Sequence, residues 1–327
     1  MPSEATLSAR RALSRLGLAY ALFFLLAYGG QLLLLPILSL LPEEVAEAPL
    51  TVWLSSLIPM YAIAFPAFYL TVRSLPRTVH EGRRLRLRHF LLFFAVSYAV
   101  MYLANLLGMA INALTDSLLG RSSAAGATEL IEASPLLYIL LFAVLLGPTI
   151  EELMFRRLLL SRLRPFGDGF AILVSALAFG FFHGNLSQFF YAFAVGLLLG
   201  YLYTATGRVR YPILLHIALN FAGSILPLLV MRSIDTEAIE ALSALESVSP
   251  DAILPLLPSL LLLLGYALLL FLAVGTGLCL IPVLLRRVRL SPAARPIPRE
   301  ERPYLLRSVG FLCFVLATLV NLVLSYL

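Results

Sequence analysis

Lysine is absent from this 327-residue chain, and charge of either sign is scarce. All 24 basic residues are arginine, 18 residues are acidic, and charged residues make up 13% of the sequence. A soluble globular domain carries about 25% charged residues, so the deficit argues against one. The net charge of +6 does not indicate nucleic-acid binding, because the arginines cluster in short loops between apolar runs.

Cysteine is nearly absent as well. The two that occur, Cys279 and Cys313, both lie in apolar runs. They exclude a disulfide framework, a CxxC redox motif and a thiolate metal site. A buried cysteine of this kind is usually a small packing residue rather than a reactive one.

Long hydrophobic runs dominate what is there: 61% of the residues are hydrophobic and the mean hydropathy is +0.94. A helix needs about 20 apolar residues to cross a bilayer, and the runs are too continuous for the alternating strands of a membrane barrel. The sequence therefore predicts an all-α, polytopic helical membrane protein with about nine transmembrane helices, or eight if the short fifth run does not cross. The expected spans are Leu18–Leu41, Leu50–Leu75, Phe90–Leu114, Pro135–Leu160, Phe170–His183, Gln188–Thr206, Pro212–Met231, Ile253–Leu285 and Ser308–Leu327.

Arginine-rich and arginine-poor loops alternate along the chain. The N-terminus and the loops after the second, fourth, sixth and eighth runs carry the arginines, whereas the other loops are net acidic or neutral. By the positive-inside rule, nine spans then place the N-terminus in the cytoplasm and the C-terminus outside. The first run is longer than a signal-peptide core and no A-x-A-like site follows it, so we expect a spanning helix there. The all-arginine usage favours a GC-rich bacterial source, and hence the inner (cell) membrane.

Three segments follow from this pattern. Residues 1–134 hold three spans, residues 135–231 hold four spans with the polar residues described next, and residues 232–327 hold a loop and two spans. No internal repeat and no soluble domain is recognisable.

The first polar motif within an apolar run is Glu151-Glu152, followed by Arg156. Residues four apart share a helix face, so Glu152 is expected to pair with Arg156. Glu151 points about 100° away and gains no partner from this motif. An unpaired carboxylate in an apolar cavity suits a general base. The alternative is that both glutamates extend to the membrane interface beside the arginines.

Two further polar motifs follow. Phe179-x-x-x-His183 ends the fifth run, and His216-x-x-x-Asn220 lies in the seventh with both side chains on one face. Two donors on one face can stabilise an oxyanion in a dry site. A structural histidine at a helix end and a helix–helix hydrogen bond are the alternatives. An ionisable residue at membrane depth costs several kcal/mol, roughly 2.5–3.5 on insertion scales, so the combination indicates a functional site.

In order and spacing, these motifs resemble those of the CPBP family of intramembrane proteases. This CAAX protease and bacteriocin-processing (Abi) family includes the CAAX prenyl endopeptidase Rce. Its EExxxR, FxxxH and HxxxN motifs correspond to the three motifs quoted above, and the resemblance covers about Pro135–Leu226. It implies an intramembrane endopeptidase in which Glu151 activates water held with His183, while His216 and Asn220 bind the oxyanion. The pair of Glu152 and Arg156 would support them.

The metal requirement stays open at this point. Glu151, His183 and His216 would make a two-histidine, one-carboxylate site for a divalent metal such as zinc, but no HExxH motif is present. If His216 binds the oxyanion, too few ligands remain, so we expect no tightly bound metal and no other cofactor. His183 lies about thirteen residues into its run, about 20 Å at 1.5 Å per residue, so only a short, tilted or displaced fifth span brings it to Glu151.

The expected partners are a peptide-precursor or membrane-protein substrate and the lipid bilayer, not nucleic acid. A non-catalytic scaffold or bacteriocin-immunity protein on the same fold is one alternative function. A transporter is another, since proton relays also use intramembrane carboxylates and imidazoles, but no inverted repeat or broken helix pair supports it.

Overall fold

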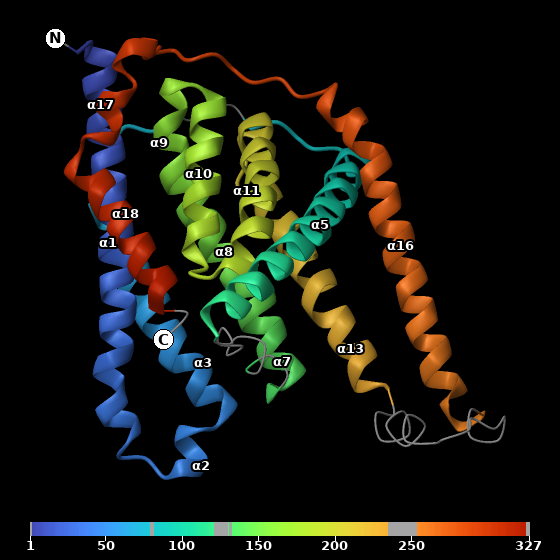
Figure 1. Ribbon diagram of the computed structural model, residues 1–327. Coiled ribbons are helices and arrows are strands. Elements are labelled where there is room, and N and C mark those ends of the chain that lie inside the picture. Colours follow the sequence, from blue (N-terminus) through green and yellow to red (C-terminus); the bar gives the residue numbers. More distant parts are fainter. Residues whose placement is uncertain (1, 79–81, 121–129, 131–132, 235–253, 325–327) are drawn as a thin grey trace.

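The computed structural model describes residues 2–78, 82–120, 130, 133–234 and 254–324, and every regular element in them is a helix (Figure 1). The α-helices are α1 (Glu4–Leu38), α2 (Glu43–Ala46), α3 (Pro49–Leu57), α4 (Phe65–Val72), α5 (Leu87–Leu119), α7 (Leu136–Tyr138), α8 (Gly147–Glu152), α9 (Ser161–Leu163), α10 (Asp168–Phe182), α11 (Leu186–Thr206), α12 (Arg210–Asn220), α13 (Leu226–Arg232), α16 (Leu257–Leu285), α17 (Pro303–Leu306) and α18 (Val309–Leu324). The π-helical segments are η1 (Ile58–Ala64), η2 (Ile139–Leu146), η3 (Leu153–Leu160) and η5 (Phe221–Ile225), and the short 3₁₀ turns are η4 (Arg164–Phe166), η6 (Leu254–Leu256) and η7 (Arg299–Glu301).

Seven helices in the described part of the chain are long and apolar enough to span a membrane. An eighth is added if Arg299–Leu306 and Val309–Leu324, bent by 60° at their junction, count as one span. The all-α polytopic membrane fold is thus confirmed. The fifth expected run forms α10, whose 15 residues reach about 22 Å and fall short of a hydrocarbon core of about 30 Å. Gly167 (φ +112°) and Gly184 (φ +73°) turn the chain at its two ends.

Three of the four π segments have a common cause in proline. Pro66, Pro148 and Pro227 each occupy the second position of the α-helix that follows η1, η2 and η5. A proline inside a helix has no N–H and its ring clashes with the carbonyl four residues earlier. Opening the preceding turn to i→i+5 spacing relieves that clash without ending the helix. No proline follows η3 in this way.

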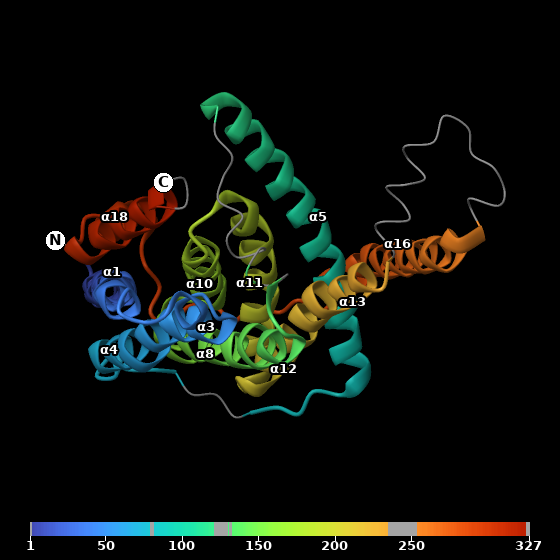
Figure 2. The same ribbon diagram turned by 90° about the horizontal axis from the view of Figure 1, so that it is seen from below.

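The centre of the bundle is the antiparallel pair α10 and α11. In Figures 1 and 2, α1 and α18 flank it on one side, and α5 and α16 lie on the other. Small residues allow the helices to approach closely, as in other membrane bundles. A Cβ on Gly196 of α11 would lie 3.2 Å from the Cα of Ala176 in α10, and one on Gly17 of α1 would lie 2.1 Å from the carbonyl oxygen of Gly310 in α18. The first and last segments of the chain therefore pack on each other and on the core, and the division at residues 134 and 231 stays a prediction.

The arginine-rich loops lie together on one face, at the top of Figure 1. Backbone hydrogen bonds join them in pairs: Thr78 N to Ser161 O (3.0 Å), Arg83 N to Thr206 O (2.8 Å) and Arg295 N to Pro165 O (2.9 Å). The N-terminus joins them through the Ser3 N–H, which donates to Glu301 Oε2 at 2.8 Å. This gathering agrees with the alternation of charge that the sequence predicts.

A valine at Gly17 tests the close packing of α1 on α18. Overpacking of this kind costs typically about 1–3 kcal/mol, so we expect Gly17→Val to lower the thermal midpoint of the detergent-solubilised protein. Gly29 lies on the same helix, and a Cβ added there would have no other atom within 4 Å, which makes Gly29→Val the matched control. Equal effects of the two substitutions would contradict the packing.

Candidate active site

The glutamate pair lies on a continuous bent helix that runs from α7 to η4. Glu151 and Glu152 end the short α8, between η2 and η3. Their side chains leave the helix in different directions and differ in access: Glu152 is 0% exposed and Glu151 is 14% exposed. Of the two carboxylates, only that of Glu151 is open to the surroundings of the protein.

The expected ion pair of Glu152 and Arg156 is formed. Arg156 Nε lies 3.0 Å from Glu152 Oε2, and both side chains are fully buried. The N–H is not aligned with the carboxylate, so this contact is a close ion pair rather than a hydrogen bond. Arg156 Nη1 donates to Ser175 Oγ (2.9 Å), and the Ser175 hydroxyl donates in turn to the Phe155 carbonyl (2.9 Å). The guanidinium also lies over the Phe179 ring, 5.1 Å from its centroid.

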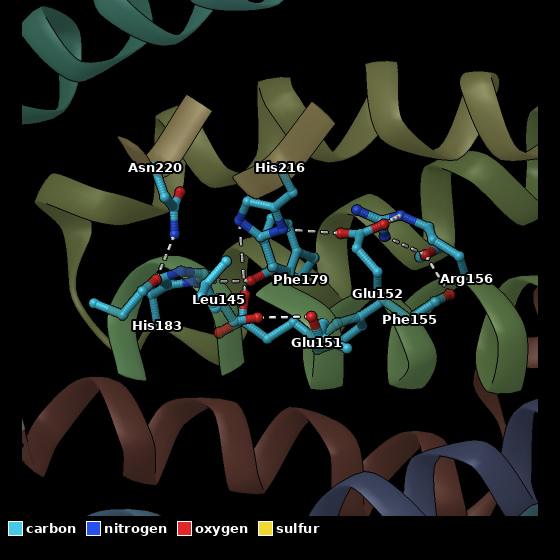
Figure 3. A network of polar contacts seen from close by, with 12 residues as sticks. Leu145, Glu151, Glu152, Phe155, Arg156, Phe179, His183, His216 and Asn220 are labelled. Carbon is cyan, nitrogen blue, oxygen red and sulfur yellow. Dashed lines mark hydrogen bonds and ion pairs between the residues drawn. The ribbon is translucent and has the colours of Figure 1, made fainter. Parts of the chain in front are cut away.

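His216 of α12 connects the two glutamates (Figure 3). Its Nδ1 lies 3.1 Å from Glu152 Oε1, and its Nε2 lies 3.8 Å from Glu151 Oε2. An ionised carboxylate only accepts hydrogen bonds, so Nδ1 carries a proton that is donated to Glu152. Arg156, Glu152 and His216 thus form a buried chain that fixes the orientation of the imidazole toward Glu151.

His183 is the C-cap of α10, and the short helix answers the question of its depth. Phe179 contacts both imidazoles edge-on, with ring centroids 5.1 Å from His183 and 5.5 Å from His216. His183 Nδ1 lies 3.1 Å from the Phe179 carbonyl oxygen, which only accepts, so this nitrogen is the donor. A neutral His183 then presents the lone pair of Nε2.

Asn220 lies one turn beyond His216 on the same face, as its spacing predicts. Its Nδ2 donates to the Ala143 carbonyl of η2 at 3.0 Å. One amide hydrogen therefore links two helices, and the second has no partner within the described ranges. The sequence left two roles for Asn220, a hydrogen bond between helices and a donor to the oxyanion. This geometry allows both.

Several neighbours of the site escape notice in the sequence because they come from distant segments. Tyr61 of η1 and Tyr191 of α11 are half-buried and lie within electrostatic reach of Glu151. A Cβ on Gly147 would lie 3.6 Å from the Tyr61 hydroxyl and 3.9 Å from Glu151 Oε1, so the tyrosine faces the same space as the carboxylate. Tyrosine is common in apolar runs, and no motif distinguishes these two.

Asn321 of α18 is the other missed neighbour. Its Nδ2 donates to the carbonyls of Phe181 (3.1 Å) and Phe182 (3.3 Å), and its Oδ1 accepts from the Tyr28 hydroxyl of α1. In the sequence it is a single amide within an apolar run, and no motif connects it with the site. In the structure, Asn321 binds the last turn of α10, which is directly followed by His183.

Each histidine of the conditional metal set uses one ring nitrogen in a contact within the protein. His216 directs Nδ1 to Glu152, and His183 directs Nδ1 to a backbone carbonyl, so each imidazole keeps Nε2 for a ligand. No group of three His, Cys, Asp or Glu side chains in the described ranges has the arrangement of a metal site. Contacts of this kind at Nδ1 are also usual for metal-bound histidines, so the absence of a tightly bound metal stays a prediction.

Comparison with known proteins identifies the same segment. Residues 133–222, which contain all six predicted site residues, match the family model described as "Type II CAAX prenyl endopeptidase Rce1-like". The "Putative membrane peptidase YdiL" of Bacillus subtilis (strain 168) is 32% identical over 93 residues, or 28% of this chain and 37% of that protein. The chain thus covers little more than a third of this relative. No solved structure gives a significant match. The resemblance inferred from the three motifs is confirmed over this segment.

Removing the guanidinium tests the buried chain of charges. Arg156→Met leaves Glu152 buried without its counter-charge, which costs about 3–5 kcal/mol, so we expect a clear loss in the free energy of unfolding. Unfolding in detergent measures it, with Arg157→Met at the adjacent exposed position as control. The double variant Glu152→Gln, Arg156→Met removes both charges and should recover part of the loss. A loss no larger than that of Arg157→Met would show that the pair is not structural.

Proposed function

We propose that this chain is an intramembrane endopeptidase that hydrolyses peptide bonds of a membrane-associated protein or peptide precursor. One observation carries the proposal. Glu151 is the accessible carboxylate of the pair, and it faces the imidazole of His216, which the buried carboxylate of Glu152 holds in place. A general base needs both access to water and a fixed position. The match of residues 133–222 to an endopeptidase family supports the same reaction.

Water activation is assigned to Glu151 with help from His183. Glu151 takes a proton as the water oxygen adds to the substrate carbonyl carbon. The His183 Nε2 lone pair accepts the other hydrogen bond of that water, since its Nδ1 is committed to Phe179. When the tetrahedral intermediate collapses, the C–N bond breaks and the proton on Glu151 passes to the leaving amine. General base catalysis of this kind contributes typically about 10²–10⁴-fold in rate.

Oxyanion stabilisation is assigned to His216 and Asn220. Nδ1–H of His216 is directed at Glu152, so donation to the oxyanion comes from Nε2 and requires the doubly protonated imidazolium. The two nearby carboxylates balance two positive charges, that of the imidazolium and that of Arg156. The free amide hydrogen of Asn220 supplies the second donor. Loss of one such donor costs about 10²–10³-fold in other hydrolases.

The setting of the reaction follows from the face that carries the arginines. That face is assigned to the cytoplasm by the positive-inside rule, in the inner membrane if the chain is bacterial. The substrate then approaches from the membrane or its cytoplasmic surface. The reaction as assigned needs no metal, because Glu151 itself activates the water.

Replacement of Glu151 tests the base. Glu151→Gln keeps the size of the side chain but accepts no proton, so we expect cleavage to fall at least about 10²-fold with an unchanged thermal midpoint. Quantitative proteomics of membrane fractions identifies the substrate as a precursor that accumulates in cells with this variant. Glu43→Gln, at an exposed carboxylate of α2, is the control. Full cleavage by Glu151→Gln would refute the mechanism. A cellular phenotype that is the same with Glu151→Gln as with the native protein would favour a non-catalytic scaffold.

Metal removal tests the catalytic type with the same substrate. We expect cleavage to persist after incubation with 1,10-phenanthroline and exchange into metal-free buffer, because the assigned water is activated by a carboxylate. Elemental analysis of the purified protein measures any zinc that remains. Activity lost on chelation and restored by zinc would instead assign Glu151, His183 and His216 as metal ligands.

A further inference from the structure

A small polar cavity of about 180 Å³ opens on the arginine-rich face, separate from the residues around Glu151. Its lining includes Arg77 after α4, Arg157 of η3, Arg164 of η4 and Tyr203 of α11. That space is large enough for a phosphate group with some hydration. Four segments of the chain therefore bring their polar groups to one point.

The arginines at this cavity have too few counter-charges. Arg164 is 6% exposed and pairs with Asp168 through Nε and Oδ1 at 2.8 Å. Asp168 Oδ2 also accepts from the Ser291 N–H at 3.0 Å, so this carboxylate is fully used. Arg77 and Arg157 are exposed, and their guanidinium groups have no hydrogen-bond or ion-pair partner in the described ranges. The hydroxyl of Tyr203 likewise has no partner there.

Arg162, which does not line the cavity, adds a fourth positive charge within electrostatic reach of Arg77. Arg162 is 4% exposed, and its Nε and Nη1 donate to the carbonyls of Val72 (2.9 Å) and Leu158 (2.7 Å). Carbonyl oxygens satisfy its donors but do not neutralise its charge. The positive-inside rule explains arginines on this face, but it does not require them to converge. Like charges held together repel, and an anion placed between them removes that cost.

The frame of the cavity is held by the backbone. Thr78 N donates to Ser161 O at 3.0 Å, and Arg164 Nη2 donates to the Thr204 carbonyl at 3.4 Å. The fixed Arg164 and Tyr203 thus form the floor, and the two exposed guanidiniums can close over a ligand. Planar guanidinium groups match the oxygens of a phosphate and bind it with charge-assisted hydrogen bonds.

We propose that this cavity is a binding site for a phosphate-bearing anion, contacted by Arg77, Arg157, Arg164 and the hydroxyl of Tyr203. The phosphate belongs either to a lipid headgroup of the inner leaflet or to a free phosphate in solution. The site is independent of the proposed proteolysis. A bound anion would nevertheless stabilise the end of the helix that carries the glutamate pair, because Arg157 and Arg164 both belong to it.

Titration of the full chain in detergent tests the site with three probes: inorganic phosphate, short-chain phosphatidic acid and short-chain phosphatidylcholine. Calorimetry measures the affinity of three proteins for each probe: the native protein, a cavity double variant and a control double variant. The cavity variant combines Arg77→Gln with Arg157→Gln, and the control combines Arg11→Gln with Arg73→Gln. Both double variants remove two exposed arginines from the same face, and only the first changes the cavity. All four side chains are exposed, so neither variant should alter the thermal midpoint.

We expect the cavity variant to bind the anionic probes about tenfold or more weakly and the control to match the native protein within about twofold, given the strength of charge-assisted hydrogen bonds. Comparable binding of inorganic phosphate and phosphatidic acid would assign a free phosphate. Binding of phosphatidic acid alone would assign a lipid headgroup, with phosphatidylcholine as the zwitterionic reference. The proposal is overturned if no anionic probe binds, if binding survives in the cavity variant, or if both variants weaken it equally.

Discussion

The buried ion pair of Glu152 and Arg156 is the contact on which the rest of the site depends. Two charges removed from water repay their desolvation only with good geometry and further hydrogen bonds, and Ser175 supplies one to Arg156. Glu152 contacts Arg156 through Oε2 and accepts Nδ1–H of His216 through Oε1. The orientation of His216 toward Glu151 is therefore set by a guanidinium that never meets substrate.

Two adjacent glutamates acquire opposite roles through this arrangement. The helix directs them about 100° apart. Both meet the imidazole of His216: Glu152 approaches Nδ1 (3.1 Å) from the packed core, and Glu151 approaches Nε2 (3.8 Å) from the partly exposed side. Full burial suits Glu152 to holding a neighbour, while the 14% exposure of Glu151 leaves it able to exchange a proton with water. A single helix thus supplies both a fixed structural charge and a reactive one.

Local spacing predicts the parts of the fold and the site that depend on one helix. The apolar runs give the helices, and the four-residue spacings give the pair of Glu152 with Arg156 and the common face of His216 with Asn220. Contacts between helices leave no such signal: neither the hydrogen bond of Asn220 to Ala143 nor the approach of Tyr61 to Glu151 follows from any spacing. The π turns could be expected where a proline lies inside an apolar run, but η3 has no such residue to announce it. The start of α1 at Glu4, well before its apolar run, reflects the Ser3 cap.

The short α10 explains why α1 and α18 matter to the site although they carry none of its motifs. Fifteen residues do not cross the bilayer, so the end of this helix lies within the protein, and its last carbonyls need partners there. Asn321 provides them from α18, and Tyr28 of α1 fixes Asn321 in turn. The family match ends at residue 222 and includes neither. His183 therefore depends for its position on the first and last spans, which pack on each other at Gly17 and Gly310, so the sequence that carries the motifs is not by itself sufficient to place them.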